Sequence, residues 1–255
     1  MHQLPKQNNL ESKNVLTAKE VSVSLFGTKI IENISVDLSV GQVLAIVGPN
    51  GAGKTTFMKA LLGLLPHTGS VLWAPSVRIG YVPQKVFISR AFPLTVEELF
   101  LLRRGTRAFW FRTGKATEHT KKWLSRVGAE NLFKKQLAVL SGGELQRVMI
   151  AYALADDANV LCLDEPAAGI DIGGGQTIYS LLKDLSLQEQ RTIILISHEL
   201  DIVFRYADEV VCIDKRMICR GSPHVVLTAE NIERMYGSHT ALYAHDGETH
   251  THQHV

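Results

Sequence analysis

The sequence predicts an α/β fold whose core is a parallel β-sheet flanked by helices. The main observation is a set of four short segments in which apolar residues follow one another without alternation. Such runs are typical of strands that are buried on both faces, as parallel strands are. Longer stretches with helical periodicity separate some of them, which is the chain order expected for an α/β protein. The four segments are 43–47, 160–163, 193–196 and 210–213.

The N-terminal part has a different pattern. Residues 20–26 and 30–40 alternate apolar and polar side chains, which predicts antiparallel strands with one face in water. Residues 77–82 add a short strand that ends at Pro83. This part of the chain therefore predicts a small antiparallel sheet ahead of most of the parallel core.

A helical block of about 70 residues, 85–155, interrupts the strands. Thr95–Glu98 and Ser141–Glu144 have the spacing of capping boxes, which start helices. A third helix is expected over 117–127, where Gly128 would end it. The block reads as an insertion into the α/β core.

Composition excludes several classes of protein. The 255 residues include 27 Lys or Arg and 25 Asp or Glu, and a net charge of +2 does not suit a protein that coats nucleic acid. The first 14 residues form a polar tail without an apolar signal segment, and no run of about 18 apolar residues occurs. We therefore expect a cytosolic protein. Cys162, Cys212 and Cys219 lie in apolar runs without a C-x-x-C pair, so reduced, buried thiols are expected instead of a disulfide.

The stretch Gly48-Pro-Asn-Gly-Ala-Gly-Lys-Thr55 follows the first buried strand and precedes an expected helix, 56–65. Its glycines let backbone N–H groups turn toward phosphate oxygens, and the helix N-terminus adds partial positive charge. Lys54 can reach the β- and γ-phosphates, and the Thr55 hydroxyl can bind Mg²⁺. An ordinary glycine-rich turn is the alternative, which the strand–loop–helix context disfavours. The predicted nucleotide-binding residues here are Gly48, Pro49, Asn50, Gly51, Ala52, Gly53, Lys54, Thr55 and Thr56.

Two acids end the second buried strand, Asp164 and Glu165, and Pro166 follows them. The carboxyl ends of parallel strands are where open α/β sheets bind ligands. Asp164 is therefore the expected Mg²⁺ partner, and Glu165 is placed to orient or deprotonate an attacking water. Without the phosphate loop, a surface turn with two solvated acids would be the better interpretation.

Two more polar residues follow predicted strands, and the strand before the first of them, 193–196, is expected to be parallel to the other two and to end at the same edge. His198 comes after 193–196 and could hydrogen-bond a γ-phosphate, and Gln84 comes after 77–82 and could bridge Mg²⁺ or its water. Their spacing alone is equally compatible with ordinary loop residues.

Together these motifs resemble the ATP-binding cassette (ABC) ATPases. The most specific one is Leu140-Ser-Gly-Gly-Glu-Leu-Gln-Arg147, which is similar to the signature motif of that family. The resemblance implies a P-loop NTPase (RecA-like) core with an antiparallel β subdomain and an inserted α-helical subdomain. It also implies an ATPase domain over 15–237, with its core in 15–84 and 156–237 and its helical subdomain in 85–155, between the tails 1–14 and 238–255.

The resemblance assigns further roles. Ser141, Gly142 and Gly143 of one chain would complete the ATP site over Lys54 of a second chain in a head-to-tail homodimer. Phe26 would stack on adenine, and Gln84 would link the nucleotide to a membrane partner. Asp171 would couple the two sites across the dimer, and His198 would be the switch histidine. Glu165, His198, Gln84 and Asp171 form the expected catalytic set, and Thr55, Gln84 and Asp164 the expected Mg²⁺ set.

Three stretches, 78–85, 93–96 and 219–226, are similar to the zinc and manganese uptake branch of ABC importers. This implies an ATPase subunit on the cytoplasmic face of the inner membrane that uses ATP and Mg²⁺. Its implied partners are a polytopic permease and a periplasmic or surface metal-binding protein, with no nucleic acid. The alternatives are the same role for manganese, iron or a metal chelate, and a soluble ABC regulator without a transporter.

The C-terminal tail and one internal segment stay open in function. His250, His252 and His254 alternate with other residues, so three imidazoles could chelate Zn²⁺, although a solvated tail of biased composition is an equal alternative. Residues 103–115 carry five cations and three aromatic side chains without an acid. A loop with inward aromatic rings is the first interpretation of this segment, and contact with the membrane partner is the second.

Overall fold

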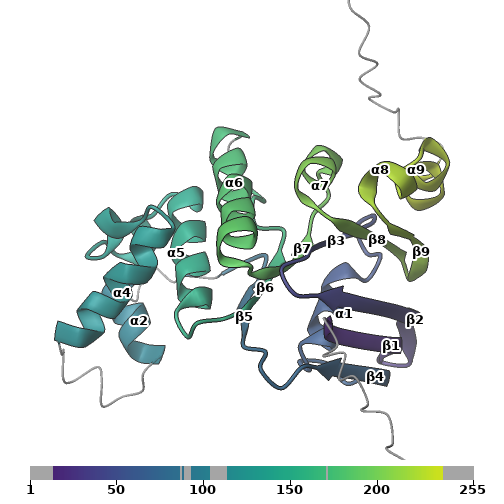
Figure 1. The fold of residues 1–255 in the computed structure, drawn as a ribbon, viewed down its shortest axis with the longest axis horizontal. Coiled ribbons are helices and arrows are strands. Elements are labelled where there is room, and N and C mark those ends of the chain that lie inside the picture. Colours follow the sequence, from purple (N-terminus) through teal and green to yellow (C-terminus); the bar gives the residue numbers. More distant parts are fainter. Residues whose placement is uncertain (1–13, 87, 89–92, 104–113, 171, 238–255) are drawn as a thin grey trace, which may run out of the picture.

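The computed structural model describes residues 14–86, 88, 93–103, 114–170 and 172–237, which form two sheets and their helices (Figure 1). The larger sheet has the strand order β5-β6-β7-β3-β8-β9, and all its neighbouring strands are parallel except β8 and β9. The strands are β3 (Val43–Val47), β5 (Ile79–Val82), β6 (Val160–Asp164), β7 (Thr192–Ile196), β8 (Glu209–Asp214) and β9 (Arg216–Gly221).

The four apolar segments are the four central strands of this sheet, as predicted. Because side chains alternate across a strand, each strand contributes side chains to the apolar cores on both faces of the sheet. Leu44 and Ile46 of β3 pack on the side of the first helix, whereas Ala45 and Val47 pack against the C-terminal helices. A strand that is covered on both faces needs apolar residues at every position, which explains the unbroken runs.

The smaller sheet is antiparallel, with the order β2-β1-β4. Its strands are β1 (Asn14–Leu25), β2 (Thr28–Ser39) and β4 (Thr68–Trp73). Helix α1 (Lys54–Leu61) shares one apolar core with both sheets, to which it contributes the fully buried Phe57 and Met58. The antiparallel sheet thus covers the helix that follows the phosphate loop.

The helical block lies at one end of the molecule (Figure 1). Its helices are α2 (Val96–Arg103), α4 (Gly114–Arg126) and α5 (Gly142–Leu154), with the short turns η1 (Glu130–Leu132) and η2 (Leu137–Val139). Both predicted capping boxes form, and Gly128, with φ of 65°, follows α4 as expected. Trp123 of α4 and Leu161 of β6 belong to one buried cluster, so the apolar core continues across the expected subdomain boundary.

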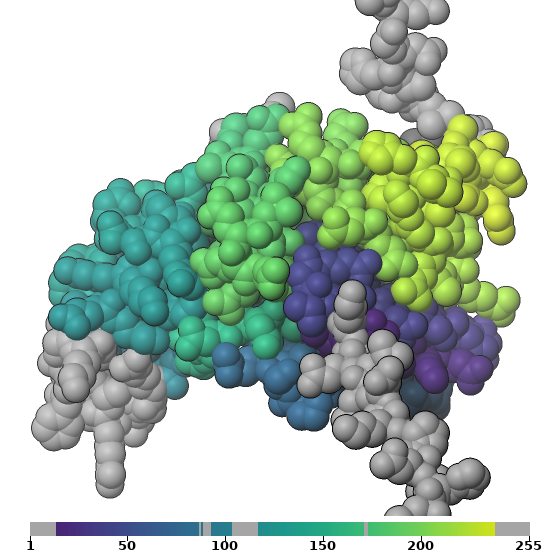
Figure 2. Space-filling view, in the orientation of Figure 1, coloured from purple at the N-terminus to yellow at the C-terminus, as the bar shows by residue number. Residues whose placement is uncertain are grey.

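The C-terminal half adds helices α6 (Ile172–Glu189), α7 (Leu200–Tyr206), α8 (Pro223–Val226) and α9 (Ala229–Tyr236). In the space-filling view, α6 lies between the helical block and α7–α9 (Figure 2). None of the helices in the described part of the chain combines the length and the apolar character that crossing a bilayer requires.

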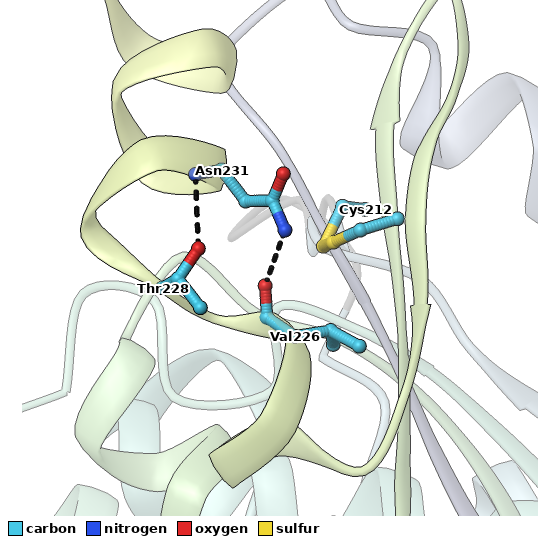
Figure 3. Close-up of a disulfide and its surroundings, with 5 residues drawn as sticks. Cys212, Val226, Thr228 and Asn231 are labelled. Carbon is cyan, nitrogen blue, oxygen red and sulfur yellow. Dashed lines mark hydrogen bonds between the residues drawn. A yellow bond between two sulfur atoms is a disulfide. The ribbon is translucent and has the colours of Figure 1, made fainter.

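The expectation of reduced thiols is wrong for two of the three cysteines. Cys212 of β8 and Cys219 of β9 form a disulfide with a Cα–Cα distance of 5.0 Å. The reason is β9, which the apolar pattern does not reveal and which pairs with β8 so that Cys219 lies opposite Cys212. Figure 3 shows the bridge beside the segment from Val226 to Asn231, where the Asn231 amide donates to the Val226 carbonyl at 2.8 Å. Cys162 is free and fully buried, and burial raises its pKa to about 12.

Candidate functional site

The phosphate-loop sequence forms the turn between β3 and α1 and borders a cavity of about 310 Å³. Two glycines in the turn have no substitute. Gly48 has φ of +152°, and a Cβ there would lie 2.0 Å from the Ile213 carbonyl oxygen. Gly53 has φ of +94°, and a Cβ there would lie 2.3 Å from the Ile31 side chain. The cavity is lined by Ile30, Asn50, Gly51, Gly53, Lys54, Thr55, Thr56, Gln84 and Glu165.

Lys54 is a buried cation, with 6% of its surface exposed. Its Nζ donates to the carbonyl oxygens of Gly48 and Pro49, at 2.8 and 2.9 Å. Burial lowers the pKa of Lys54, and the nearby carboxylates of Glu165 and Asp164 oppose that shift. The side chain therefore brings positive charge to a cavity that backbone N–H groups and a helix N-terminus also line, which suits a phosphate chain.

Asp164 ends β6 and is 2% exposed. Its Oδ2 accepts a hydrogen bond from the Thr55 hydroxyl at 2.8 Å, while its Oδ1 is buried without a partner. Burial raises the pKa of Asp164, and the Thr55 hydrogen bond acts against that shift. A buried carboxylate oxygen with no donor beside a hydroxyl is an arrangement that a hard divalent cation would satisfy, so these residues fit Mg²⁺.

Glu165 is held in an uncommon backbone conformation, with φ of 48°. Its N–H donates to the Ile196 carbonyl on β7 at 3.0 Å, which ties the turn after β6 to the end of β7. Two side chains meet the same carboxylate oxygen, Oε2. Gln84 donates to it from Nε2 at 2.6 Å, and His198 Nδ1 lies 3.7 Å from it.

These three side chains come from segments that are far apart in the sequence. Because β5, β6 and β7 are parallel neighbours, Gln84, Glu165 and His198 follow strands that end at one edge of the sheet. The structure thus brings together the predicted phosphate loop, the predicted Mg²⁺ residues and three of the four predicted catalytic residues.

The predicted signature residues lie elsewhere. Ser141 caps α5, accepting from the Glu144 N–H, and a Cβ on Gly142 or Gly143 would lie 3.6 Å from the Ile170 side chain. None of the three lines the cavity beside Lys54. Gly142 instead borders a second cavity, of about 290 Å³, which Gln84 also lines.

Phe26 lies in the turn between β1 and β2, fully exposed and outside the lining of the phosphate-loop cavity. Asp171, His250, His252 and His254 lie outside the described residues, as does most of the segment 103–115. Within the described ranges no group of three His, Cys, Asp or Glu side chains is arranged to hold a metal ion.

One lining residue was missed by the sequence analysis. Ile30, on β2, borders the cavity, although its alternating pattern marked it only as part of a strand. No local signal identifies it, because its position at the cavity depends on how the antiparallel sheet packs on the phosphate loop.

The chain is similar to known proteins over most of its length. The protein-family profile described as "ABC transporter" matches residues 31–168. A zinc import ATP-binding protein ZnuC from Yersinia enterocolitica is 36% identical over 245 residues, which cover 94% of this chain and 92% of that protein. The ZnuC of Buchnera aphidicola is 34% identical over 244 residues, covering 94% of this chain and 98% of that protein.

Solved structures give the same picture of the fold. A chain of a putative metal-chelate type ABC transporter in an inward-facing conformation superposes with a TM-score of 0.78 at 26% identity, covering 88% of this chain and 89% of that one. CbiO1 from Clostridium perfringens, described as part of the ABC transporter complex cbiONQ, superposes with a TM-score of 0.71 at 27% identity. That match covers 87% of this chain and 94% of the other.

Proposed function

This chain belongs to the ABC transporter family, and from that premise we propose that it is the ATP-hydrolysing subunit of an importer that takes up zinc through a separate membrane subunit. The observation that carries the ATPase role is the convergence of Gln84 and His198 on Glu165, which lines the same cavity as Lys54. The zinc assignment is supported by relatives that match over nearly the whole length of both chains.

The phosphate loop is proposed to bind the phosphates of ATP. The N–H groups of residues 48–56 and the Lys54 ammonium would hold the β- and γ-phosphates, and Phe26, fully exposed, would be free to stack on adenine. Thr55 Oγ1, Asp164 and Gln84 would hold Mg²⁺ directly or through water. Mg²⁺, when bound, neutralises charge that develops on the transferred phosphoryl group.

Glu165 is the proposed base that orients or deprotonates the attacking water. Glu165 lines the cavity, and the Gln84 amide holds one of its carboxylate oxygens at 2.6 Å. The other oxygen, Oε1, stays available to accept a proton from water. His198, with 55% of its side chain exposed, is able to turn toward a γ-phosphate and to report its presence.

The phosphate-loop cavity is not lined by Ser141, Gly142 or Gly143. Their separation from it supports a head-to-tail homodimer. In such a dimer the N-terminus of α5 would face the γ-phosphate held by the partner, and Asp171 would lie near the interface. ATP would close the dimer, and hydrolysis would open it. The proposed partners are a polytopic permease, contacted near Gln84, and a periplasmic or surface metal-binding protein, so the chain would sit on the cytoplasmic face of the membrane.

The test is growth of a deletion strain in metal-depleted medium. Wild type and Glu165→Gln are each returned to the strain, and zinc, manganese and iron are added back separately. Glu230→Gln is the matched control, because Glu230 is an exposed acid in the first turn of α9, away from the site. We expect a zinc-specific uptake defect that wild type and Glu230→Gln repair and Glu165→Gln does not.

Other results would contradict parts of this proposal. If the wild-type gene restores growth that depends on manganese or iron, and not growth that depends on zinc, the ATPase assignment stands and the zinc assignment is wrong. Normal growth without the gene, together with no membrane protein co-purifying with the tagged chain, would favour a soluble regulator.

A further inference from the structure

Tyr179 of α6 is buried beside the loop that carries His198, with 2% of its surface exposed. Its ring stacks on Tyr206 of α7, with the centroids 6.0 Å apart and the planes inclined by 23°. Burial raises the pKa of Tyr179 well above its ordinary value, so its hydroxyl stays protonated at neutral pH. A protonated hydroxyl in this position needs an acceptor.

That hydroxyl is hydrogen-bonded to a neighbour of His198. It donates to Glu199 Oε1 at 3.4 Å and also lies near the Ser197 side chain. Ser197 is itself 2% exposed, and its Oγ accepts from the Glu199 N–H at 3.1 Å. The backbone N–H of Ser197 donates to Ile46 of β3 at 3.3 Å. The loop is therefore tied to the sheet at Ser197 and to Tyr179 at Glu199.

The same helix also contacts the loop that follows Glu165. Gly175 lies one turn before Tyr179, and a Cβ there would lie 3.4 Å from the Ala167 Cβ. Both loops border one cavity of about 1010 Å³, to which Ala167, Gly175, His198 and Glu199 contribute. One helix thus contacts both the loop that follows Glu165 and the loop that carries His198.

We propose that Tyr179 is a positioning residue for His198, which acts by fixing the Ser197–Glu199 loop so that the imidazole stays beside Glu165. The inference rests on the proposed ATPase function and deepens it. His198 itself is exposed and contacts Glu165 at 3.7 Å, a distance that a small shift of its loop would change. A hydroxyl that is hydrogen-bonded to the residue after the histidine limits that shift.

The test compares Tyr179→Phe with Tyr206→Phe. Both variants remove one phenol hydroxyl from the same ring stack, but only the first loses the hydrogen bond to Glu199. We expect Tyr179→Phe to lower the kcat for ATP roughly two- to tenfold, as the loss of about one hydrogen bond predicts, and to leave the KM for ATP unchanged. Tyr206→Phe should behave as wild type, and Ser197→Ala should resemble Tyr179→Phe.

A double-mutant cycle identifies the route of the effect. If Tyr179 acts through His198, Tyr179→Phe adds no further loss to His198→Ala, measured in single-turnover assays that detect slow hydrolysis. An equal additional loss on that background would overturn the proposal, as would a kcat equal to that of Tyr206→Phe. A lowered melting temperature with unchanged kcat would show a structural role only. Absence of ATP hydrolysis by the wild type would refute the proposed function instead.

Discussion

Replacing Asp164 by Asn should stabilise the nucleotide-free protein while removing its response to Mg²⁺. Asp164 is 2% exposed, and only one of its oxygens has a partner, the Thr55 hydroxyl at 2.8 Å. A buried polar atom without a partner costs about 1–3 kcal/mol, and more when it carries charge. Asn keeps the shape and a partner for Thr55 but carries no charge. We expect a gain of about 1 kcal/mol in the free energy of unfolding, or about 2–4 °C in melting temperature.

The dependence of the wild type's stability on pH shows why removing the charge of Asp164 should stabilise the protein. Burial raises the folded-state pKa of Asp164 above its ordinary value of 3.8, so the folded state holds its proton to higher pH than the unfolded state does. Stability of the wild type therefore falls as pH rises from that ordinary value to the folded-state pKa and is level above it. The amide that replaces the carboxyl group in the Asp164→Asn variant does not titrate, so the advantage of the variant should grow between pH 4 and pH 7.5.

The assay is thermal unfolding with and without nucleotide. MgATP at about 100 times its dissociation constant should raise the melting temperature of the wild type by about 5–11 °C, from a linkage energy of about 2.7 kcal/mol. The Asp164→Asn variant should lose most of the Mg²⁺-dependent rise in melting temperature. ATP with a chelator should raise the melting temperature of both proteins equally. A variant that is less stable than the wild type without nucleotide at pH 7.5 would refute the burial argument. An undiminished shift with MgATP would refute the Mg²⁺ assignment.

Single residues in the site, in β5 and in β6 give three more tests. Glu165→Gln should lower kcat by roughly 10²–10⁴-fold, the usual contribution of a general base, while equilibrium binding of ATP changes little; near-normal turnover would remove Glu165 from this role. Gly80→Ala should lower the free energy of unfolding by about 1–3 kcal/mol or more in urea titrations, because the added Cβ would lie 2.4 Å from the Ala153 carbonyl oxygen; unchanged stability would mean that β5 and α5 are farther apart. Cys162 should resist thiol reagents at pH 8 until the protein unfolds, because it is fully buried and its pKa is about 12; reaction at the rate of a free thiol would contradict that burial.

The phosphate loop and the central strands could be predicted because their signals are local. Residues 48–55 form one continuous turn, so their spacing carries the geometry, and the four apolar runs record burial on both faces of each strand. Both capping boxes are likewise local, since each links residues three positions apart. Strands β4 and β9 lack such a signal: β4 is largely exposed, and β9 is partly buried at the edge of the sheet.

The rest depends on how distant segments meet. The disulfide between Cys212 and Cys219 follows from the register of β8 against β9, which composition and spacing do not show. Tyr179 belongs to no motif of the sequence, and only the packing of α6 brings its hydroxyl to Glu199.

The chemistry that we propose for this protein can be read from its amino-acid sequence: a predicted phosphate-binding turn, two acids after a buried strand, and a segment at a helix start that resembles the family signature. The tertiary structure decided which side chains act on one another. The strand order β5-β6-β7 brings Gln84, Glu165 and His198 to one sheet edge although 81 and 33 positions separate them in turn. The physical reason is that hydrogen bonding between parallel strands aligns their carboxyl ends, whatever length of chain connects them.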